Sequence, residues 1–352
     1  MITRKKTKTI FLKHIKIGSD HPITVQSMCN TKTSDITSTI NQIIQLEKNG
    51  CDIVRLAVPD LDSAKAISTI ANEVNIPIVA DIHFDYNLAI EAIKNGANGL
   101  RLNPGNIGSK EKIEKILNYA KDYQVPIRIG VNSGSIAKHI LKKFGVSAEG
   151  IVESALEHVR ILEDHNFDKI KISVKASSVP LTIQAYKIIA QRTDYPLHLG
   201  VTEAGTEFSG TIKSAIGIGS LLAEGIGDTI RVSLTDDPVK EVLVGKAILK
   251  SLGYIKGLEI ISCPTCGRTQ IPLIELTNEV EKRLACFDDL DIKIAVMGCA
   301  VNGPGEAKEA DFGIAGGKNE GLLFAKGEII KKVPAAFLVD ELVRLVATAS
   351  RR

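Results

Sequence analysis

The sequence predicts a (β/α)8 barrel followed by a smaller α+β domain. Two observations favour this class: short apolar segments alternate with amphipathic helical patterns, and this alternation stops near residue 252. Strands separated by helices pair in parallel, and eight such units in one run are typical of a barrel. An open doubly wound sheet is the alternative, but no Gly-x-Gly-x-x-Gly follows the first apolar segment. We expect the barrel over residues 1–252, a linker over 253–257 and the second domain over 258–352.

The expected barrel strands are short runs of apolar and β-branched residues: 23–28, 52–58, 78–83, 99–103, 127–132, 169–176, 197–202 and 229–234. Amphipathic helical patterns lie between them, the clearest over 36–48, 109–123, 147–165 and 238–252. In the first of these, Ser34 or Asp35 can cap the start of the helix and Gly50 can end it.

Length and charge narrow the class of protein. The 352 residues are enough for one large and one small domain, and 44 basic against 41 acidic residues give no general attraction to nucleic acid. No apolar run could span a membrane, and the N-terminus lacks a signal-peptide core. Free thiols and the iron–sulfur cluster expected below point to a reducing cytoplasm. The basic run over residues 4–8 leads into alternating apolar and basic residues from Ile10 onward, which predicts a solvated or edge strand.

A weak internal repeat places a cation late in several strands. Three segments share the order glycine, apolar strand, arginine, and they contain Arg55, Arg101 and Arg231, while Arg128 and Lys175 add two more cations in other strands. Unpaired buried charge costs several kcal/mol per ion, so these five cannot all lie in a barrel core. They are tolerated at the carboxyl-terminal mouth of a barrel, where substrates bind and a polyanion can neutralise them.

Polar residues on the same strand faces as these cations belong to the same predicted site, because side chains alternate along a strand. Guanidinium groups match the geometry of phosphate oxygens, so we expect a small phosphate or diphosphate ester as ligand. The alternative is a structural network in which carboxylates pair the cations. The candidate substrate-binding residues are Arg55, Asp81, His83, Arg101, Asn103, Arg128, Asn132, Lys175, Arg231 and Ser233.

A carboxylate follows the seventh expected strand, in Val201-Thr-Glu203-Ala-Gly205. In a partly dry site a carboxyl group can have a raised pKa and exchange protons with a substrate, so Glu203 is a candidate catalytic acid or base. The alternative is an ion-pair partner of an arginine without a chemical role. His83 and His198 could equally be packing residues.

Three cysteines predict an iron–sulfur cluster in the second domain. Cys263-Pro-Thr-Cys266 places two thiols on one turn, and Cys299 follows on a Gly/Pro-rich loop. Three thiolates suit a cluster held at three corners, with the fourth iron left to another ligand. A structural zinc site is an alternative, but no histidine follows His198 to complete it. A thioredoxin-like redox pair would leave Cys299 unexplained.

The other three cysteines are expected to have no role at the cluster. Cys29 and Cys51 lie beside apolar strands and should be small packing residues, whereas Cys286 points away from the apolar stripe of its predicted helix. Around the cysteines the pattern predicts a helix over 271–287, strands over 292–297, 320–325 and 327–333, a glycine-marked segment over 311–317 and a last helix over 334–349.

With these motifs in view, the whole chain resembles the 4-hydroxy-3-methylbut-2-enyl diphosphate synthases in their two-domain bacterial form. The two cysteine motifs are the most specific. Cys29 stands where that family is expected to have threonine after Gln-Ser-Met, and no extra domain separates the two parts, unlike the plant-type enzymes. The motifs that carry the resemblance are Val25-Gln-Ser-Met28, Val79-Ala-Asp81-Ile-His83, Arg101-Leu-Asn-Pro-Gly105, Arg128-Ile-Gly-Val-Asn132, Val201-Thr-Glu203-Ala-Gly205, Ser262-Cys-Pro-Thr-Cys-Gly-Arg268 and Met297-Gly-Cys-Ala-Val-Asn-Gly-Pro-Gly-Glu306.

The resemblance implies an iron–sulfur oxidoreductase of the non-mevalonate isoprenoid pathway. The implied reaction is the two-electron ring opening and dehydration of 2-C-methyl-D-erythritol 2,4-cyclodiphosphate, with ferredoxin or flavodoxin as electron donor. The implied cofactor is a [4Fe-4S] cluster on Cys263, Cys266 and Cys299, with Glu306 on the fourth iron. The implied assembly is a head-to-tail homodimer, which also suits a chain that should leave the barrel at the end opposite its mouth.

Two other classes of function remain open at this point. A pterin-dependent transferase on a similar barrel would leave the cysteines unexplained, and an electron carrier or scaffold would leave the barrel cations unexplained. The missing Cys-x3-Cys-x2-Cys argues against a radical adenosylmethionine enzyme.

Overall fold

The computed structural model describes residues 2–288, 290–299 and 307–349. The chain divides into two compact units, Met1–Tyr254 and Ile255–Arg352. Each is described by itself below.

The first unit is an eight-stranded parallel barrel, which confirms the predicted fold class. Neighbouring strands run in the order β8-β7-β6-β5-β4-β3-β10-β9, and a single bridge between Ile172 and Leu197 joins the two ends of this sheet. The strands are β3 (Thr24–Met28), β4 (Ile53–Ala57), β5 (Ile78–Asp81), β6 (Gly99–Leu102), β7 (Ile127–Asn132), β8 (Ile170–Lys175), β9 (His198–Leu199) and β10 (Thr229–Ile230). All eight lie within the expected ranges, although β9 and β10 are shorter than expected.

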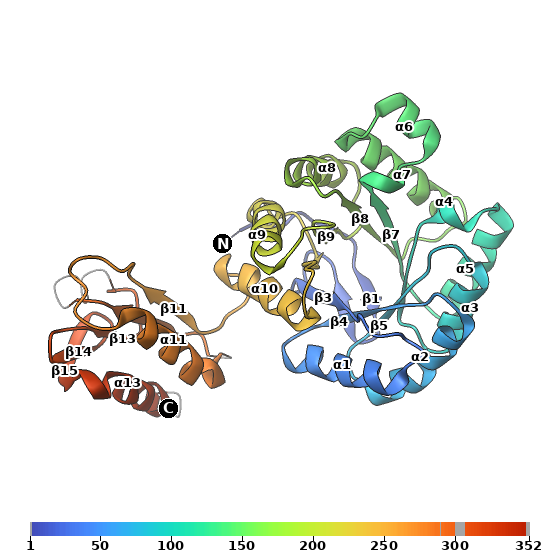
Figure 1. Ribbon diagram of the computed structural model, residues 1–352. Helices are drawn as coiled ribbons and strands as arrows, with labels where there is room; N and C mark the ends of the chain where they lie inside the picture. The colour runs from blue at the N-terminus through green and yellow to red at the C-terminus, as the bar shows by residue number, and fades with distance from the viewer. Residues whose placement is uncertain (1, 289, 300–306, 350–352) are drawn as a thin grey trace. The chain divides into compact units, whose positions relative to one another are not determined.

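Helices surround the barrel strands (Figure 1). They are α1 (Ile36–Lys48), α2 (Leu61–Glu73), α3 (Tyr86–Lys94), α4 (Pro104–Ile107), α5 (Lys110–Asp122), α6 (Lys138–Phe144), α7 (Ala148–Glu163), α8 (Val179–Arg192), α9 (Glu207–Ala223) and α10 (Pro238–Ser251). The helix α1 has the predicted bounds, and its cap is Asp35, whose side chain accepts a hydrogen bond from the Ser38 backbone N–H. These caps and apolar stripes fix the helices against the strands, so the strand ends form a rigid mouth.

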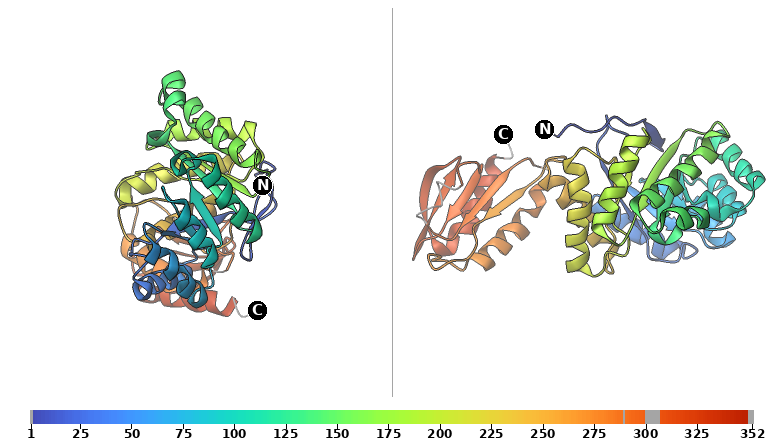
Figure 2. Two further views of the ribbon diagram at one scale, coloured as in Figure 1. Left: turned by 90° about the vertical axis from the view of Figure 1, so that its right-hand side faces the viewer. Right: turned by 90° about the horizontal axis from the view of Figure 1, so that it is seen from above.

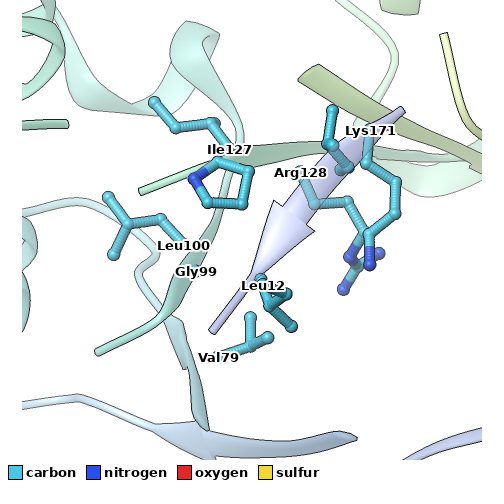
Figure 3. A pocket seen from close by; sticks show the side chains of 9 residues that line it. Leu12, Val79, Gly99, Leu100, Ile127, Arg128 and Lys171 are labelled. Carbon is cyan, nitrogen blue, oxygen red and sulfur yellow. The ribbon is translucent and has the colours of Figure 1, made fainter. Parts of the chain in front are cut away.

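An N-terminal hairpin closes the opposite end of the barrel. Its strands β1 (Ile10–Leu12) and β2 (Ile15–Ile17) pair in antiparallel fashion. The sequence predicted a solvated or edge strand here, and the prediction of solvation is wrong for Ile10 and Leu12, which are 3% and 2% exposed. Leu12 reaches over Gly99, where a Cβ would lie only 2.6 Å from its side chain. Figure 3 shows Leu12 beside Val79 and Gly99 at this end.

The second unit is a five-stranded mixed sheet with two helices packed against it (Figures 1 and 2). Strands β11, β12 and β13 are parallel, and β13, β14 and β15 are antiparallel. One apolar core joins both helices to the sheet and includes Val280, Ile294 and Leu342. The elements are β11 (Glu259–Ser262), α11 (Leu273–Leu284), β12 (Lys293–Met297), β13 (Phe312–Ala315), β14 (Glu320–Ala325), β15 (Glu328–Pro334) and α13 (Leu338–Ala349).

Two strands of this unit were not predicted as strands. The glycine-marked segment over 311–317 contains β13, which is buried at the centre of the sheet, and β11 precedes the first cysteine motif. Gly313 belongs in β13 because the Phe324 ring of β14 occupies the space where its Cβ would lie. Among the residues that the structure describes, no helix is long and apolar enough to cross a membrane.

Candidate functional site

A polar cavity of about 200 Å³ lies at the carboxyl-terminal end of the barrel strands. We call it the mouth cavity. It brings together side chains from β4, β5, β6, β7 and β8 and from the segments that follow β5, β9 and β10. Its lining residues are Arg55, Asp81, His83, Arg101, Arg128, Asn132, Ser173, Lys175, Thr202, Arg231 and Ser233.

Nine of the ten candidate substrate-binding residues line the mouth cavity, and Asn103 does not. Asn103 is 4% exposed and follows β6 directly. Ser173 and Thr202 line the cavity although the sequence did not single them out. The alternation rule could have found Ser173, because it lies two residues before Lys175 on the same strand face.

Asp81 holds two of the guanidinium groups. Its Oδ1 accepts a hydrogen bond of 3.1 Å from Arg101 Nη1, and its Oδ2 lies 3.6 Å from both Arg55 Nε and His83 Nε2. Burial alone would raise the pKa of Asp81, but the nearby His83 imidazole and the neighbouring guanidinium charges outweigh burial and hold that pKa well below its ordinary value. Asp81 is therefore a carboxylate at neutral pH and fixes the cations beside it.

Glu241 contacts a third guanidinium group, that of Arg231. Glu241 was not among the candidate residues predicted from the sequence. This residue of α10 is 4% exposed. Its carboxylate lies 3.3 Å from Arg231 Nη2 and accepts hydrogen bonds from Ser27 Oγ at 2.9 Å and from the Leu234 backbone N–H at 3.1 Å. One carboxylate thus ties β3, the segment after β10 and helix α10 together around Arg231.

Within the described residues, the other two mouth cations, Arg128 and Lys175, form no ion pair with a carboxylate. Arg128 donates from Nη1 to Ser173 Oγ at 2.7 Å, but its Nε and Nη2 have no hydrogen-bond partner within the described part of the chain. Burial, with the nearby guanidinium charges, lowers the pKa of both Arg128 and Lys175 well below their ordinary values. The cavity therefore holds more positive groups than negative ones, and it favours an anionic ligand.

Glycines in adjacent strands make room for these long side chains. A Cβ on Gly200 would lie 2.5 Å from Lys175 Nζ, and one on Gly130 would lie 3.0 Å from Arg101 Nε. Neither position has an unusual backbone that requires glycine. At Gly130 the small residue leaves room for the cation, and at Gly200 it leaves room both for the cation and for the Arg231 backbone carbonyl oxygen, which would lie 2.6 Å from a Cβ.

Glu203 lies next to the cavity but does not line it. It is exposed, and its backbone has a φ of +53°, a left-handed conformation that is costly for a residue other than glycine. Its neighbour Thr202 does line the cavity. Glu203 is therefore next in the chain to a residue that lines the mouth cavity.

The cysteine motifs follow two adjacent parallel strands of the second unit. Cys263 directly follows β11 and Cys299 lies two residues after β12, and these strands pair with Ser262 opposite Val296. The Gly298 backbone N–H donates to Cys263 Sγ at 3.1 Å, and the Gln270 N–H donates to the Gly298 carbonyl at 2.9 Å. The two motifs are thus hydrogen-bonded to each other.

The donor set fits an iron–sulfur cluster. Amide N–H groups that donate to cysteine sulfur are a recurring feature of such centres and tune their potential. Hydrogen bonding by Arg268 lowers the pKa of the Cys266 thiol, which favours the thiolate that a metal needs. Over the described residues, however, no three His, Cys, Asp or Glu side chains already lie together as a metal-binding group. Glu306, the expected fourth ligand, lies outside the described residues.

The remaining cysteines lie where the sequence predicted. Cys29 and Cys51 are buried, and burial raises the pKa of each thiol to about 12. Cys286 is exposed and donates from Sγ to the Arg283 carbonyl.

Several solved structures share the barrel fold. The dihydropteroate synthase of Yersinia pestis aligns with a TM-score of 0.50 at 11% identity and covers 69% of this chain and 97% of its own. The N-acetylneuraminic acid synthetase of Leptospira borgpetersenii aligns with a TM-score of 0.50 at 14% identity and covers 79% and 97%. At such identities the likeness extends to the fold alone.

Sequence comparison is far more specific. The family models described as "GcpE TIM-barrel domain" and "GcpE protein C-terminal domain" match residues 7–246 and 259–348. A protein of Clostridium perfringens is 60% identical over 99% of this chain and 100% of its own length. A protein of Geobacter sulfurreducens is 58% identical over 97% of each. Both carry the name 4-hydroxy-3-methylbut-2-en-1-yl diphosphate synthase (flavodoxin). With both units matched and more than half of the residues identical along almost the whole length, the chain belongs to the GcpE family of 4-hydroxy-3-methylbut-2-en-1-yl diphosphate synthases.

Proposed function

We propose that the chain catalyses the reductive ring opening and dehydration of 2-C-methyl-D-erythritol 2,4-cyclodiphosphate to 4-hydroxy-3-methylbut-2-enyl diphosphate. This is the activity named for relatives that are about 60% identical over nearly the full length. The observation that carries the proposal at the level of residues is the excess of buried cations over carboxylates in the mouth cavity. Such a cavity selects a small polyanion, and a cyclic diphosphate is one.

In this proposal the mouth cations bind the diphosphate. The nitrogens of Arg128 that lack a protein partner, together with Arg101 and Arg231, donate to phosphate oxygens. The pKa of Lys175 is lowered by burial and by the neighbouring cations, and an arriving polyanion reverses this effect. Lys175 Nζ is then protonated in the complex. Asp81 and Glu241 keep the guanidinium groups oriented before the substrate arrives.

Glu203 has the proposed role of a proton donor. The dehydration breaks the bond between a carbon and a hydroxyl oxygen, and that oxygen needs a proton to leave as water. Glu203 directly follows Thr202, which lines the mouth cavity, and its carboxyl group is proposed to supply that proton.

Cys263, Cys266 and Cys299, with Glu306 as the fourth ligand, are the residues proposed to hold a [4Fe-4S] cluster. A cluster of this kind supplies the electrons that the ring opening consumes. Carboxylate is a harder and more exchangeable iron ligand than thiolate, so Glu306 would suit the one cluster position that the three thiolates leave to another ligand. Reduced flavodoxin is the proposed electron donor, because the relatives' names carry it. The free cysteines fit a protein of the reducing cytoplasm. We propose residues 253–257 as the linker between the barrel and the cluster domain.

The two alternative functions are less well supported. Dihydropteroate synthases share the barrel at 11% identity, which supports only a common fold. An electron carrier has no use for the buried cations of the mouth cavity.

We also propose that the cluster domain of one chain acts on the mouth cavity of a second chain in a homodimer. Tyr254 closes the barrel unit by donating from Oη to the Leu222 carbonyl, at the end of α9 and thus opposite the mouth. From Tyr254 to Cys263 the chain can extend at most about 31 Å, at about 3.5 Å per residue. The barrel helices alone are about 21 Å long at about 1.5 Å per residue, so returning to the chain's own mouth requires a nearly straight path around the outside. A two-fold pair removes this constraint.

The first prediction concerns the diphosphate clamp. Arg101→Ala and Arg231→Ala should each weaken substrate binding by roughly 1.5–3 kcal/mol, because each removes a charge-assisted hydrogen bond. Isothermal titration measures the affinity. Arg192→Ala is the matched control, since Arg192 at the end of α8 forms surface ion pairs with Glu149 and Glu153 of α7. Unchanged affinity in both mouth variants would refute the clamp.

The second prediction concerns Glu241 as a positioning residue. Glu241→Gln removes the charge that orients Arg231, so KM should rise while kcat changes much less. The double variant with Arg231→Ala should bind substrate no worse than Arg231→Ala alone, because the two residues act as one unit. Additive losses in this double-mutant cycle would mean that Glu241 acts on the fold rather than through Arg231.

The third prediction concerns the cluster ligands. Changing Cys263, Cys266 or Cys299 to Ser should lower iron and acid-labile sulfide to a small fraction of the wild-type content after anaerobic reconstitution. Cys286→Ser should retain both, because this thiol follows the end of α11 and precedes β12, whereas both motifs follow the ends of strands β11 and β12. Loss of iron in Cys286→Ser together with retention in Cys299→Ser would show that the third ligand is wrongly assigned.

The fourth prediction concerns the shared site. Glu203→Ala and Cys299→Ser chains should each be inactive, and mixing them should restore part of the activity. In a mixed dimer one site then carries both lesions and the other carries none. Native mass spectrometry checks that mixed dimers form. If they form and no activity returns, each chain completes its own site.

A further inference from the structure

Thr269 contacts both cysteine motifs of the second unit but is not one of the proposed cluster ligands. Its side chain is half-buried, whereas those of its neighbours Arg268 and Gln270 are exposed. The Thr269 backbone N–H donates to the Cys266 carbonyl at 3.0 Å, and the Cys266 backbone N–H donates to Thr269 Oγ1 at 3.1 Å. These two hydrogen bonds close the turn that carries Cys266.

The hydroxyl group of Thr269 has a second contact, with the sulfur of Cys266. Thr269 Oγ1 donates to Cys266 Sγ at 4.0 Å, which is a long hydrogen bond. A hydroxyl group carries one proton and two lone pairs, so it can accept from the backbone N–H and donate to the sulfur at once. A thiolate accepts a hydrogen bond more strongly than a thiol because it is charged. The contact is therefore expected to tighten when Cys266 loses its proton to bind iron.

The Thr269 side chain also packs against the second motif. A Cβ on Gly298 would lie only 3.0 Å from Thr269 Cγ2 and 3.1 Å from Thr269 Oγ1. Gly298 is the residue whose backbone N–H donates to Cys263 Sγ. Thr269 thus contacts one cysteine directly, and it contacts the residue that donates a hydrogen bond to another.

Packing alone does not account for a hydroxyl group at this position. The Gln270 backbone N–H already links the two motifs, because it donates to the Gly298 carbonyl at 2.9 Å. Packing on Gly298 requires only the shape of the side chain, and valine has the same shape as threonine. A role that uses the hydroxyl group therefore lies in its two contacts with Cys266.

We propose that Thr269 is a positioning residue of the iron–sulfur centre, whose hydroxyl group orients Cys266 and raises the reduction potential of the cluster through the Cys266 sulfur. Reduction adds negative charge to a cluster and its thiolates, and a hydrogen bond to sulfur stabilises that charge. A higher potential favours electron transfer from the donor to the cluster. The inference rests on the proposed cluster, but it concerns the potential of that cluster and not the substrate.

Redox titration of the anaerobically reconstituted full chain, followed by electron paramagnetic resonance, tests this role. Thr269→Val removes the hydroxyl group and keeps the shape, so the midpoint potential should become more negative. Loss of one hydrogen bond should lower the equilibrium constant for one-electron reduction about threefold to tenfold, a shift of about 28–59 mV. Thr269→Ser keeps the hydroxyl group and should keep the wild-type potential.

Thr265→Val is the matched control, because Thr265 lies in the first motif with an exposed side chain, and it should keep the wild-type potential. An unchanged potential in Thr269→Val would overturn the proposal. A shift of equal size in Thr269→Ser, which lacks only the methyl group, would overturn it in favour of packing. An equal shift in Thr265→Val would show a general effect of the loop and would also overturn it.

Electron–nuclear double resonance of the reduced cluster in D2O gives a second readout. The wild-type chain and Thr269→Ser should show a hydroxyl deuteron coupled to the cluster, and Thr269→Val should lack it. Identical deuteron signals in all three would contradict the contact with the Cys266 sulfur.

If Thr269→Val binds no cluster, Thr269→Ser decides: wild-type iron content and potential support the role of the hydroxyl group, and loss of either overturns it. None of these measurements uses a substrate. A result against Thr269 with an intact four-iron cluster therefore leaves the proposed reaction standing, whereas a wild-type chain that assembles no such cluster overturns both.

Discussion

The barrel unit depends on holding several like charges close together inside a closed sheet. Among the described residues, Asp81 and Glu241 are the carboxylates that make this possible at the mouth cavity: Asp81 contacts Arg55 and Arg101 of neighbouring strands, and Glu241 of α10 contacts Arg231. Arg128 and Lys175 are left without such a partner, so the site is poised for an anion. The free energy that is unfavourable in the empty protein becomes binding energy when a polyanion enters.

Packing around these charges follows from the same constraint. Small residues lie where a cation must pass, as at Gly130 and Gly200, and the apolar Leu12 of the N-terminal hairpin seals the end from which water would enter. A rigid lining with water excluded from below keeps the local dielectric low and the interactions of the cations with a ligand strong. The residues that line the mouth cavity all belong to the first unit. The second unit places two cysteine motifs at the ends of adjacent strands.

Much of this architecture could be predicted from the sequence, because it is local. Apolar strands, amphipathic helices and the late position of Arg55, Arg101 and Arg231 are periodic features that a single chain displays. Glu241 could not be found in this way, since it lies within an amphipathic helix and acquires its role only when α10 packs under β3. The prediction that the N-terminal hairpin is solvated was wrong because basic residues alternate there with apolar ones, and the apolar Ile10 and Leu12 are buried.

In the proposed function, the mouth cavity binds a cyclic diphosphate and the three-cysteine domain supplies the electrons that open it. Phosphorus-31 NMR of the anaerobically reconstituted full chain, with reduced flavodoxin and 2-C-methyl-D-erythritol 2,4-cyclodiphosphate, tests it most directly. The account predicts that the cyclic diphosphate resonances are replaced by those of a linear diphosphate ester, with two electrons consumed for each molecule converted. A protein with its full iron and sulfide content that binds the cyclodiphosphate and leaves its resonances unchanged under these conditions would contradict it.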